Sequence, residues 1–212
     1  GSYYYGLTTG MNDVYTAEID PITGKLLKQP SRVAESFVGI NRLPAWSPDG
    51  QYLAYNRRGP AGVGRGSANI VIRSLQTGEE RNISPRLRIT QPPLLRWFPD
   101  GRSLLVSGWD TSQVTYYRLD VQTGEAIPIL ESTAGELAFQ PDISPDGKAI
   151  FYSFRDRDRT AKTSRIMMHQ IDTGQDKELY RVAPPLWMDN SLSASPDGRE
   201  LAFFLYNESK RS

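Results

Sequence analysis

A tight turn of the form Ser-Pro-Asp-Gly recurs four times and constrains the fold more than any other feature of the chain. Proline fixes φ near the value that the first central position of a type I turn requires, and glycine takes the left-handed conformation that closes a hairpin with a bulge. Phe98 replaces the serine in the second copy, so the hydroxyl is not required. Structural turn roles are therefore assigned to Pro48, Asp49, Gly50, Pro99, Asp100, Gly101, Pro145, Asp146, Gly147, Pro196, Asp197 and Gly198.

A second marker, Thr-Gly, alternates with this turn. The four glycines of the first marker are 51, 46 and 51 residues apart, and those of the second marker (Gly24, Gly78, Gly124 and Gly174) are 54, 46 and 50 apart. Each repeat therefore holds two tight turns and two more variable connections, which requires four antiparallel strands. A repeat of about 40–50 residues with four strands is typical of a β-propeller blade.

The motif around the first turn also points to a family. Ala45-Trp46-Ser47-Pro48-Asp49-Gly50, the strand Tyr52-Leu53-Ala54-Tyr55 and a later strand that ends in Leu75-Gln76-Thr77-Gly78 resemble the repeat of TolB-like bacterial β-propellers, a WD40-like family. The resemblance covers nearly the whole chain. It implies an all-β propeller of four-stranded antiparallel blades, a bacterial origin, a periplasmic location and partners in envelope complexes or sensing. Function resides in sites grafted onto folds, so the resemblance assigns no specific activity.

The repeat divides a single domain, residues 1–212, into four units and a partial fifth: 1–36, 37–84, 85–131, 132–181 and 182–212. Alternation of apolar residues between the turns predicts the strands. The expected strands are 3–7, 14–19 and 32–35; 43–46, 52–56, 69–75 and 79–83; 94–97, 103–107, 114–119 and 125–130; 140–143, 149–154, 165–171 and 177–180; and 192–194 and 200–206.

The expected strands are slightly more than four four-stranded blades require. The second strand of one blade is offered twice, by residues 3–7 and by residues 200–206, so a closed four-bladed ring would hold a surplus strand. We therefore expect about four blades that form part of a larger ring of roughly six to eight. An open arc exposes edge strands, which favours self-association.

Composition excludes several classes of function. The formal net charge of +1 gives no general attraction to nucleic acid. The sequence contains no run of 18 apolar residues, so no transmembrane segment is predicted. The chain has no cysteine and one histidine, so thiol nucleophiles, Cys-based zinc sites and multi-histidine metal sites are not expected. We expect no cofactor.

No catalytic constellation is evident. His169 lies in an apolar strand and is interpreted as a packed, hydrogen-bonded residue rather than a general base. The glycine-rich segment 62–67 precedes a strand and not a helix, which disfavours phosphate binding, and no Gly-x-Ser-x-Gly elbow occurs. The charge-alternating segment 155–159 is interpreted as a salt-bridged loop. We expect neither a catalytic residue nor a metal ligand.

The longer connections all fall on the face of the disc opposite the tight turns, here called the loop face. They comprise residues 8–12, 37–42, 57–67, 84–93, 109–113, 131–139, 155–162 and 181–190, and carry 11 Lys or Arg against 6 Asp or Glu. Variable loops on a rigid scaffold commonly bind partners, and Arg with Trp is a typical interface composition. The predicted partner-binding residues are Arg57, Arg58, Arg86, Arg88, Trp109, Arg155, Arg157 and Trp187.

These observations favour a non-catalytic module that binds a protein or peptide on the loop face. Two alternatives stay open: the gating propeller of a larger enzyme such as a serine peptidase, and a structural arc that assembles with copies of itself. Residues 1–212 contain no hydrolase elbow, and the enzyme alternative therefore depends on further domains.

Overall fold

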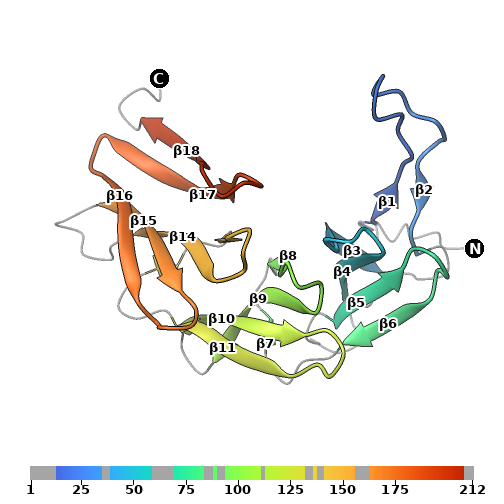
Figure 1. Cartoon of the computed structure of the whole chain (residues 1–212), viewed down its shortest axis with the longest axis horizontal. Helices are drawn as coiled ribbons and strands as arrows, with labels where there is room; N and C mark the ends of the chain where they lie inside the picture. The colour runs from blue at the N-terminus through green and yellow to red at the C-terminus, as the bar shows by residue number, and fades with distance from the viewer. Residues whose placement is uncertain are drawn as a thin grey trace, which may run out of the picture.

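The computed structural model describes residues 13–34, 39–58, 69–83, 88–89, 94–110, 113–131, 136–137, 141–155 and 163–207, and every regular element in these ranges is a β-strand (Figure 1). The strands are β1 (Tyr15–Thr16), β2 (Ser31–Arg32), β3 (Ile40–Trp46), β4 (Tyr52–Arg58), β5 (Asn69–Ser74), β6 (Glu80–Ile83), β7 (Arg88–Ile89), β8 (Leu95–Trp97), β9 (Ser103–Asp110), β10 (Gln113–Asp120), β11 (Ala126–Glu131), β12 (Glu136–Leu137), β13 (Asp142–Ile143), β14 (Ala149–Arg155), β15 (Ser164–Gln170), β16 (Asp176–Val182), β17 (Leu186–Ala194) and β18 (Leu201–Asn207).

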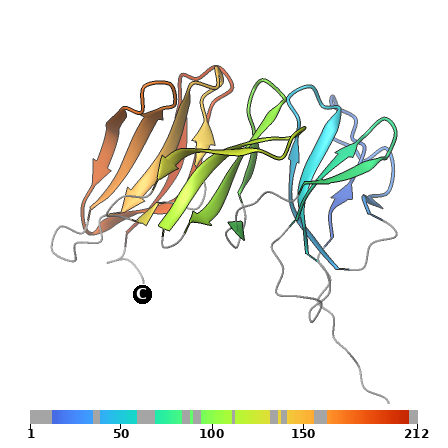
Figure 2. The ribbon, with the colours of Figure 1, turned by 90° about the horizontal axis from the view of Figure 1, so that it is seen from below.

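The strands form antiparallel sheets that are the blades of a β-propeller. Blade two is β3-β4-β5-β6; blade three pairs β7 and β8 with β9, followed by β10 and β11; blade four pairs β12 and β13 with β14, followed by β15 and β16. Two-stranded sheets stand at the ends: β1-β2, the N-terminal end sheet, and β17-β18, the C-terminal end sheet. The sheets stand side by side along an open arc (Figures 1 and 2).

The repeated tight turns share one backbone conformation and one pattern of hydrogen bonds. Gly50, Gly101, Gly147 and Gly198 have φ between 65° and 72°, the left-handed conformation that the turn chemistry predicts. The Ser47 hydroxyl donates to Asp49 Oδ1 at 2.5 Å and accepts the main-chain N–H of Tyr52 at 2.8 Å. The turns at Ser144 and Ser195 repeat this pattern.

Asp100 compensates for the missing hydroxyl at Phe98. Its Oδ1 accepts the main-chain N–H groups of Arg102 at 2.8 Å and Ser103 at 3.2 Å, and the second of these is the donor that serine binds in the other copies. Phe98 is 1% exposed and belongs to the core between blades three and four. The aromatic substitution therefore adds apolar packing while the turn keeps its hydrogen bonds.

The innermost strand of each blade is bent or interrupted midway. In β3 the register shifts between Arg42 and Ala45, and Leu43 has a φ of 55°. In blades three and four, two short strands pair in turn with the same neighbour, and β17 shifts register between Met188 and Leu192. Such bulges let one strand follow a twisted sheet over a longer distance.

Strands therefore extend further toward the loop face than the sequence predicts. The assignment of residues 37–42 and 57–67 to loops is wrong in part, because Asn41 and Ile40 pair with Arg57 and Arg58 as strand residues. Beyond its bulge, β3 continues to pair with the end of β4. The alternation of apolar residues has already ended there, so the sequence pattern gives no sign of this pairing. The same correction applies to Arg88, Trp109, Arg155, Arg181 and Trp187, which lie in β7, β9, β14, β16 and β17.

The core consists of apolar layers between neighbouring blades. Ile72 of blade two packs with Leu104 and Leu119 of blade three in the first layer, and Leu105 and Tyr116 of blade three pack with Ile150 of blade four in the next. Two smaller layers join the end sheets to blades two and four. Truncating a fully buried leucine in such a layer typically costs about 2–5 kcal/mol, so these contacts hold the arc together.

Candidate functional site

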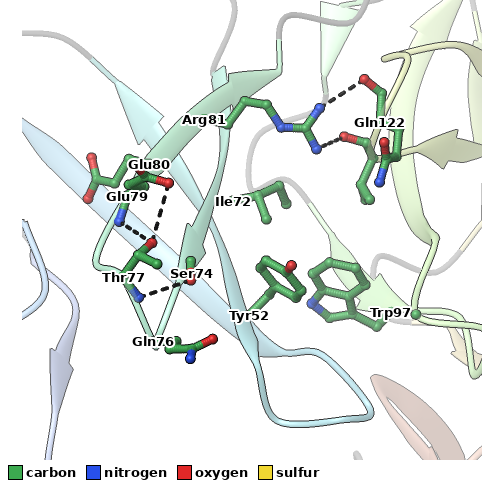
Figure 3. Close-up of a pocket in the computed structure, with 12 residues that line it drawn as sticks. Tyr52, Ile72, Ser74, Gln76, Thr77, Glu79, Glu80, Arg81, Trp97 and Gln122 are labelled. Atoms are coloured by element: carbon green, nitrogen blue, oxygen red, sulfur yellow. Dashed lines mark hydrogen bonds between the residues drawn. The ribbon is translucent and has the colours of Figure 1, made fainter.

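A groove lies between blades two and three on the side of the tight turns. It encloses about 860 Å³ and is called here the interblade groove. Figure 3 shows Tyr52 and Trp97 side by side at one end of the groove, Arg81 at the other end and Ile72 between them. The lining residues are Tyr52, Ile72, Ser74, Gln76, Thr77, Glu79, Glu80, Arg81, Trp97, Gly101, Val121 and Gln122.

The aromatic end of the groove is fixed by a contact between blades. Trp97 is the last residue of β8, and its indole Nε1 donates to the main-chain carbonyl of Ala45 in β3 at 2.9 Å. Tyr52, the first residue of β4, is 39% exposed beside it. Both rings offer apolar faces in a hollow with polar edges, as binding sites for peptide or small organic groups commonly do.

Arg81 closes the opposite end of the groove. It projects from β6, and its two terminal nitrogens donate to the main-chain carbonyls of Val121 and Gln122 in the Thr-Gly turn of blade three (Figure 3). A guanidinium carries five N–H donors, and the Arg81 side chain makes no other hydrogen bond in the described part of the chain, so it keeps donors for a ligand. The carbonyl oxygens hold the guanidinium in place and, because they are neutral, do not offset its positive charge.

Short polar side chains form the rim. Ser74 Oγ accepts the main-chain N–H of Thr77 at 3.2 Å, and Thr77 Oγ1 accepts that of Glu79 at 3.3 Å. The side-chain amides of Gln76 and Gln122 make no hydrogen bond in the described part of the chain.

A partly buried polar cluster of blade two shares Glu80 with the lining of the groove. The Tyr55 hydroxyl donates to Glu80 Oε1 at 2.5 Å, and Arg57 and Arg73 reach the same carboxylate at 2.8 and 3.1 Å. Partial burial raises the pKa of Glu80, but the hydrogen bonds from Tyr55 and Arg57 outweigh it and hold the pKa below its ordinary value. Burial and the bond to Glu80 raise the pKa of Tyr55.

The cluster continues into the N-terminal part of the chain. Arg57 Nε donates to Asn41 Oδ1 at 3.1 Å, and the Asn41 amide donates to Asp13 Oδ1 at 2.8 Å. Asp13 in turn forms a 2.6 Å ion pair with Arg32 of β2. This chain of contacts ties the N-terminal end sheet to blade two through charged groups.

Blade four repeats the arrangement with different residues. Tyr152 donates to Asp176 Oδ1 at 3.1 Å, and His169 Nδ1 lies 3.0 Å from the same oxygen. Counted from the two turns of each blade, Tyr152 and Asp176 correspond to Tyr55 and Glu80. His169 is 5% exposed, in agreement with the prediction of a packed, hydrogen-bonded strand residue. The sequence signal that identifies this repeated cluster is a tyrosine in the second strand with an acid two residues after Thr-Gly.

The predicted partner-binding residues are not all brought together. Arg57 has an 11% exposed side chain within the polar cluster, Arg58 is exposed at the end of β4, and Trp187 is half-buried in β17. For Arg88, Trp109 and Arg155 the structure describes the strand backbone, and Arg86 and Arg157 lie outside the described residues. The interblade groove is not among the predicted sites, because its residues come from four strands and three turns.

No group of three or more His, Cys, Asp or Glu side chains is placed to hold a metal ion within these ranges. No helix in them is long and apolar enough to cross a membrane.

Two solved bacterial propellers have a similar fold. A TolB structure from Acinetobacter baumannii superimposes with a TM-score of 0.59 at 20% identity, covering 88% of this chain and 46% of that one. A protein from Agrobacterium tumefaciens assigned as TolB superimposes with a TM-score of 0.60 at 21% identity, covering 93% and 68%. At these identities the likeness shows the fold alone.

An enzyme shares the same fold. Oligogalacturonate lyase from Vibrio parahaemolyticus superimposes with a TM-score of 0.58 at 13% identity, covering 82% of this chain and 49% of that one. The propeller by itself therefore does not separate binding proteins from enzymes.

Sequence comparison gives the family. The uncharacterised protein Atu1656 of Agrobacterium fabrum is 26% identical over 166 residues, 76% of this chain and 53% of that protein, so the chain spans about half the length of this curated relative. The family model of the TolB β-propeller domain matches residues 15–212. The chain therefore belongs to the TolB β-propeller domain family.

Proposed function

We propose that this propeller is a non-catalytic binding module, and that the interblade groove takes a peptide segment of a partner protein. The observation that carries the proposal is the groove itself. It is a hollow of about 860 Å³ between two blades, with Tyr52 and Trp97 at one end and a fixed guanidinium at the other. Peptides bind such hollows by stacking an apolar side chain on aromatic rings while their main chain bonds to polar groups at the rim.

The rim supplies the polar groups that a peptide needs. An extended peptide exposes main-chain N–H and C=O groups that lose water on binding and require partners. The Gln76 and Gln122 amides offer donors and acceptors, Glu79 offers acceptors and Arg81 offers donors. The groove therefore holds both kinds of partner within reach of one aromatic surface.

The loop face is proposed as a second contact surface. Arg58 is exposed there, and its side chain makes no hydrogen bond or ion pair in the described part of the chain. Its charge, together with the excess of Lys and Arg on this face, supports attraction of an acidic partner. The family supports a periplasmic location, where partners in envelope complexes would be met.

The test is selection of peptides from a random phage-displayed library on the immobilised chain, followed by measurement of Kd for the selected synthetic peptides by fluorescence anisotropy. We expect Tyr52→Ser to weaken binding about tenfold, equivalent to about 1.4 kcal/mol. Ile127→Ser is the matched control, because Ile127 is 56% exposed on β11 outside the groove. Peptides that bind Tyr52→Ser as tightly as the unchanged chain would refute the groove assignment.

The alternative of a gating propeller within a larger enzyme is supported by the likeness to an enzyme propeller. It predicts a hydrolase or lyase domain joined to this propeller in the complete protein. Turnover of peptide or glycoside substrates by residues 1–212 alone would contradict the proposed binding function.

A further inference from the structure

The repeat does not impose the rings and the guanidinium of the interblade groove. Each of these side chains has a fixed place relative to a turn glycine. The residues in the same places at the next interface, between blades three and four, differ from Tyr52, Trp97 and Arg81: they are Ser103, Ile143 and Ile127. The apolar layer at that interface forms with Ile143 in the place of the tryptophan. Packing of neighbouring blades therefore does not by itself require an aromatic pair and an arginine here.

Arg81 differs from Arg57 and Arg73 of the same blade in what holds it. Those two arginines reach the carboxylate of Glu80 at 2.8 and 3.1 Å. Arg81 donates instead to two neutral carbonyl oxygens of blade three and makes no ion pair in the described ranges. A guanidinium held by neutral acceptors is already ordered when a ligand arrives, so it loses little conformational entropy on pairing with a carboxylate.

Asp120 of blade three lies near Arg81 but is held by its own turn. Its Oδ1 accepts the main-chain N–H of Thr123 at 2.7 Å and that of Gln122 at 2.8 Å. The pKa of Asp120 lies below its ordinary value chiefly because of the bond from Thr123, with a smaller contribution from Arg81. Asp120 is therefore not an ion-pair partner of Arg81, and the guanidinium keeps its capacity to bind a carboxylate.

The acidic residues that line the groove do not neutralise Arg81 either. The carboxylate of Glu80 belongs to the polar cluster of blade two. Glu79 accepts the hydroxyl of Thr77 at 3.4 Å on the side of the blade two turn, whereas the Arg81 guanidinium reaches across to blade three (Figure 3). A ligand carboxylate over the blade three wall therefore meets an opposite charge, and one over the blade two turn meets a like charge.

The strand register gives the spacing between the two ends of the groove. Tyr52 lies opposite Ser74, and Ile72, two residues earlier on β5, lies opposite Arg81. Two strand spacings of about 4.8 Å and two residues of about 3.4 Å separate the Cα atoms of Tyr52 and Arg81 by roughly 12 Å. An extended peptide carries side chains i and i+4 on one face, about 13 Å apart. A peptide side chain on the rings therefore has its fourth neighbour near the guanidinium.

We propose, on the basis of the peptide-binding function proposed above, that the groove selects segments in which an acidic side chain lies four residues from an apolar one. The apolar side chain stacks on Tyr52 and Trp97, and the carboxylate pairs with the remaining N–H donors of Arg81. Apolar stacking accepts many sequences, and the carboxylate pair narrows them to segments with this spacing. Arg81 is thus the residue that determines specificity.

The test uses synthetic, C-terminally amidated copies of library-selected peptides that lose affinity for Tyr52→Ser. We expect these peptides to carry an acidic residue four positions from an apolar one. Exchange of this residue for its amide should raise Kd about tenfold for the unchanged chain and less than about twofold for Arg81→Gln. The two forms of a peptide are compared on the same protein, so a change in the stability of Arg81→Gln does not enter the comparison.

Lys177→Gln is the matched control, because Lys177 is exposed and holds the place of Arg81 in blade four. It removes one positive charge outside the groove and should leave the tenfold difference unchanged. Free-acid forms of the same peptides are measured beside the amides. A loss of affinity seen only when the terminal carboxylate is amidated would assign Arg81 to chain termini and overturn the proposal.

The remaining outcomes separate this inference from the function on which it rests. Peptides that depend on Tyr52 but bind equally well in the acid and amide forms of the side chain overturn the role of Arg81 and leave the groove as a peptide site. Peptides that bind Tyr52→Ser unchanged, or a library that yields no binding peptide, refute the peptide site and the role of Arg81 together.

Discussion

The indole Nε1 of Trp97 donates to the carbonyl oxygen of Ala45 at 2.9 Å, across the boundary between blades two and three. This bond joins the innermost strands of two blades and holds the aromatic end of the interblade groove in place. The equivalent two positions are joined again between blade four and β17, where Asp142 Oδ2 accepts the main-chain N–H of Ala194 at 2.8 Å. Neighbouring blades are thus linked by hydrogen bonds at one level of the arc as well as by apolar layers.

Trp97→Phe should lower the free energy of unfolding by about 1–2 kcal/mol, because it removes this hydrogen bond together with some buried ring area. Tyr52→Phe is the control: the Tyr52 hydroxyl has no hydrogen-bond partner in the described ranges, so its removal should change stability far less. Urea unfolding followed by circular dichroism measures both. Equal effects would show that the Trp97–Ala45 bond does not contribute to stability.

Replacement of the turn glycines by alanine should destabilise the fold by different amounts. Gly101→Ala should destabilise by roughly 1–2 kcal/mol, because alanine must adopt the left-handed conformation, although a Cβ there meets nothing within 4 Å. Gly147→Ala should cost more, since its Cβ would lie 3.2 Å from Pro99 Cδ of the neighbouring turn. Denaturant unfolding of both variants decides the order, and a smaller loss at Gly147 would contradict the packing of adjacent turns.

Glu80 should make stability depend on pH in the acid range. Its folded-state pKa lies below the ordinary value of 4.5, so the unfolded chain takes up the proton first. The stabilisation is therefore complete above about pH 4.5 and is lost as the pH falls through the folded pKa. Glu80→Gln should cost about 1–3 kcal/mol at pH 7 and flatten the loss of stability below pH 4.5.

Glu131→Gln is the control for this experiment, because Glu131 is exposed and its side chain makes no hydrogen bond or ion pair in the described part of the chain. Thermal unfolding between pH 3 and 7 gives the profiles. A Glu80→Gln profile parallel to that of the unchanged chain would mean that the polar cluster does not couple folding to this proton.

The loop-face proposal predicts slower partner association for Arg58→Glu. Electrostatic complementarity acts mainly on the association rate, and salt screens it over about 8–10 Å, so association of the unchanged chain should also slow as salt rises. Lys148→Glu, beside a tight turn on the opposite face, is the control. Surface plasmon resonance with a captured envelope partner measures the rates, and an equal loss in both variants would exclude the loop face as the contact surface.

The sequence predicted the strands well where apolar alternation and turn chemistry agree. β4, β9 and β14 each begin at the residue that the turn spacing indicated, since proline and glycine set the turn locally. The prediction failed where the hydrogen-bond and ion-pair partners of a residue come from distant segments of the chain. Arg57 was interpreted as a loop residue for partner binding, although Glu80, Tyr55 and Asn41 hold it inside the sheet.

The interblade groove was not predicted for the same physical reason. Tyr52, Arg81, Trp97 and Gln122 are far apart in the sequence, and each looks like an ordinary strand or turn residue. Only the angle between two blades brings them around one hollow, and that angle depends on the packing of Ile72 against blade three. No local pattern encodes it.

A crystal structure of the chain with a library-selected peptide tests the central claim most directly. The proposal predicts peptide density in the interblade groove, with an apolar side chain on the rings of Tyr52 and Trp97 and the peptide main chain within hydrogen-bond distance of Gln76, Gln122 or Arg81. Peptide bound at any other surface, with the groove unoccupied, would contradict it.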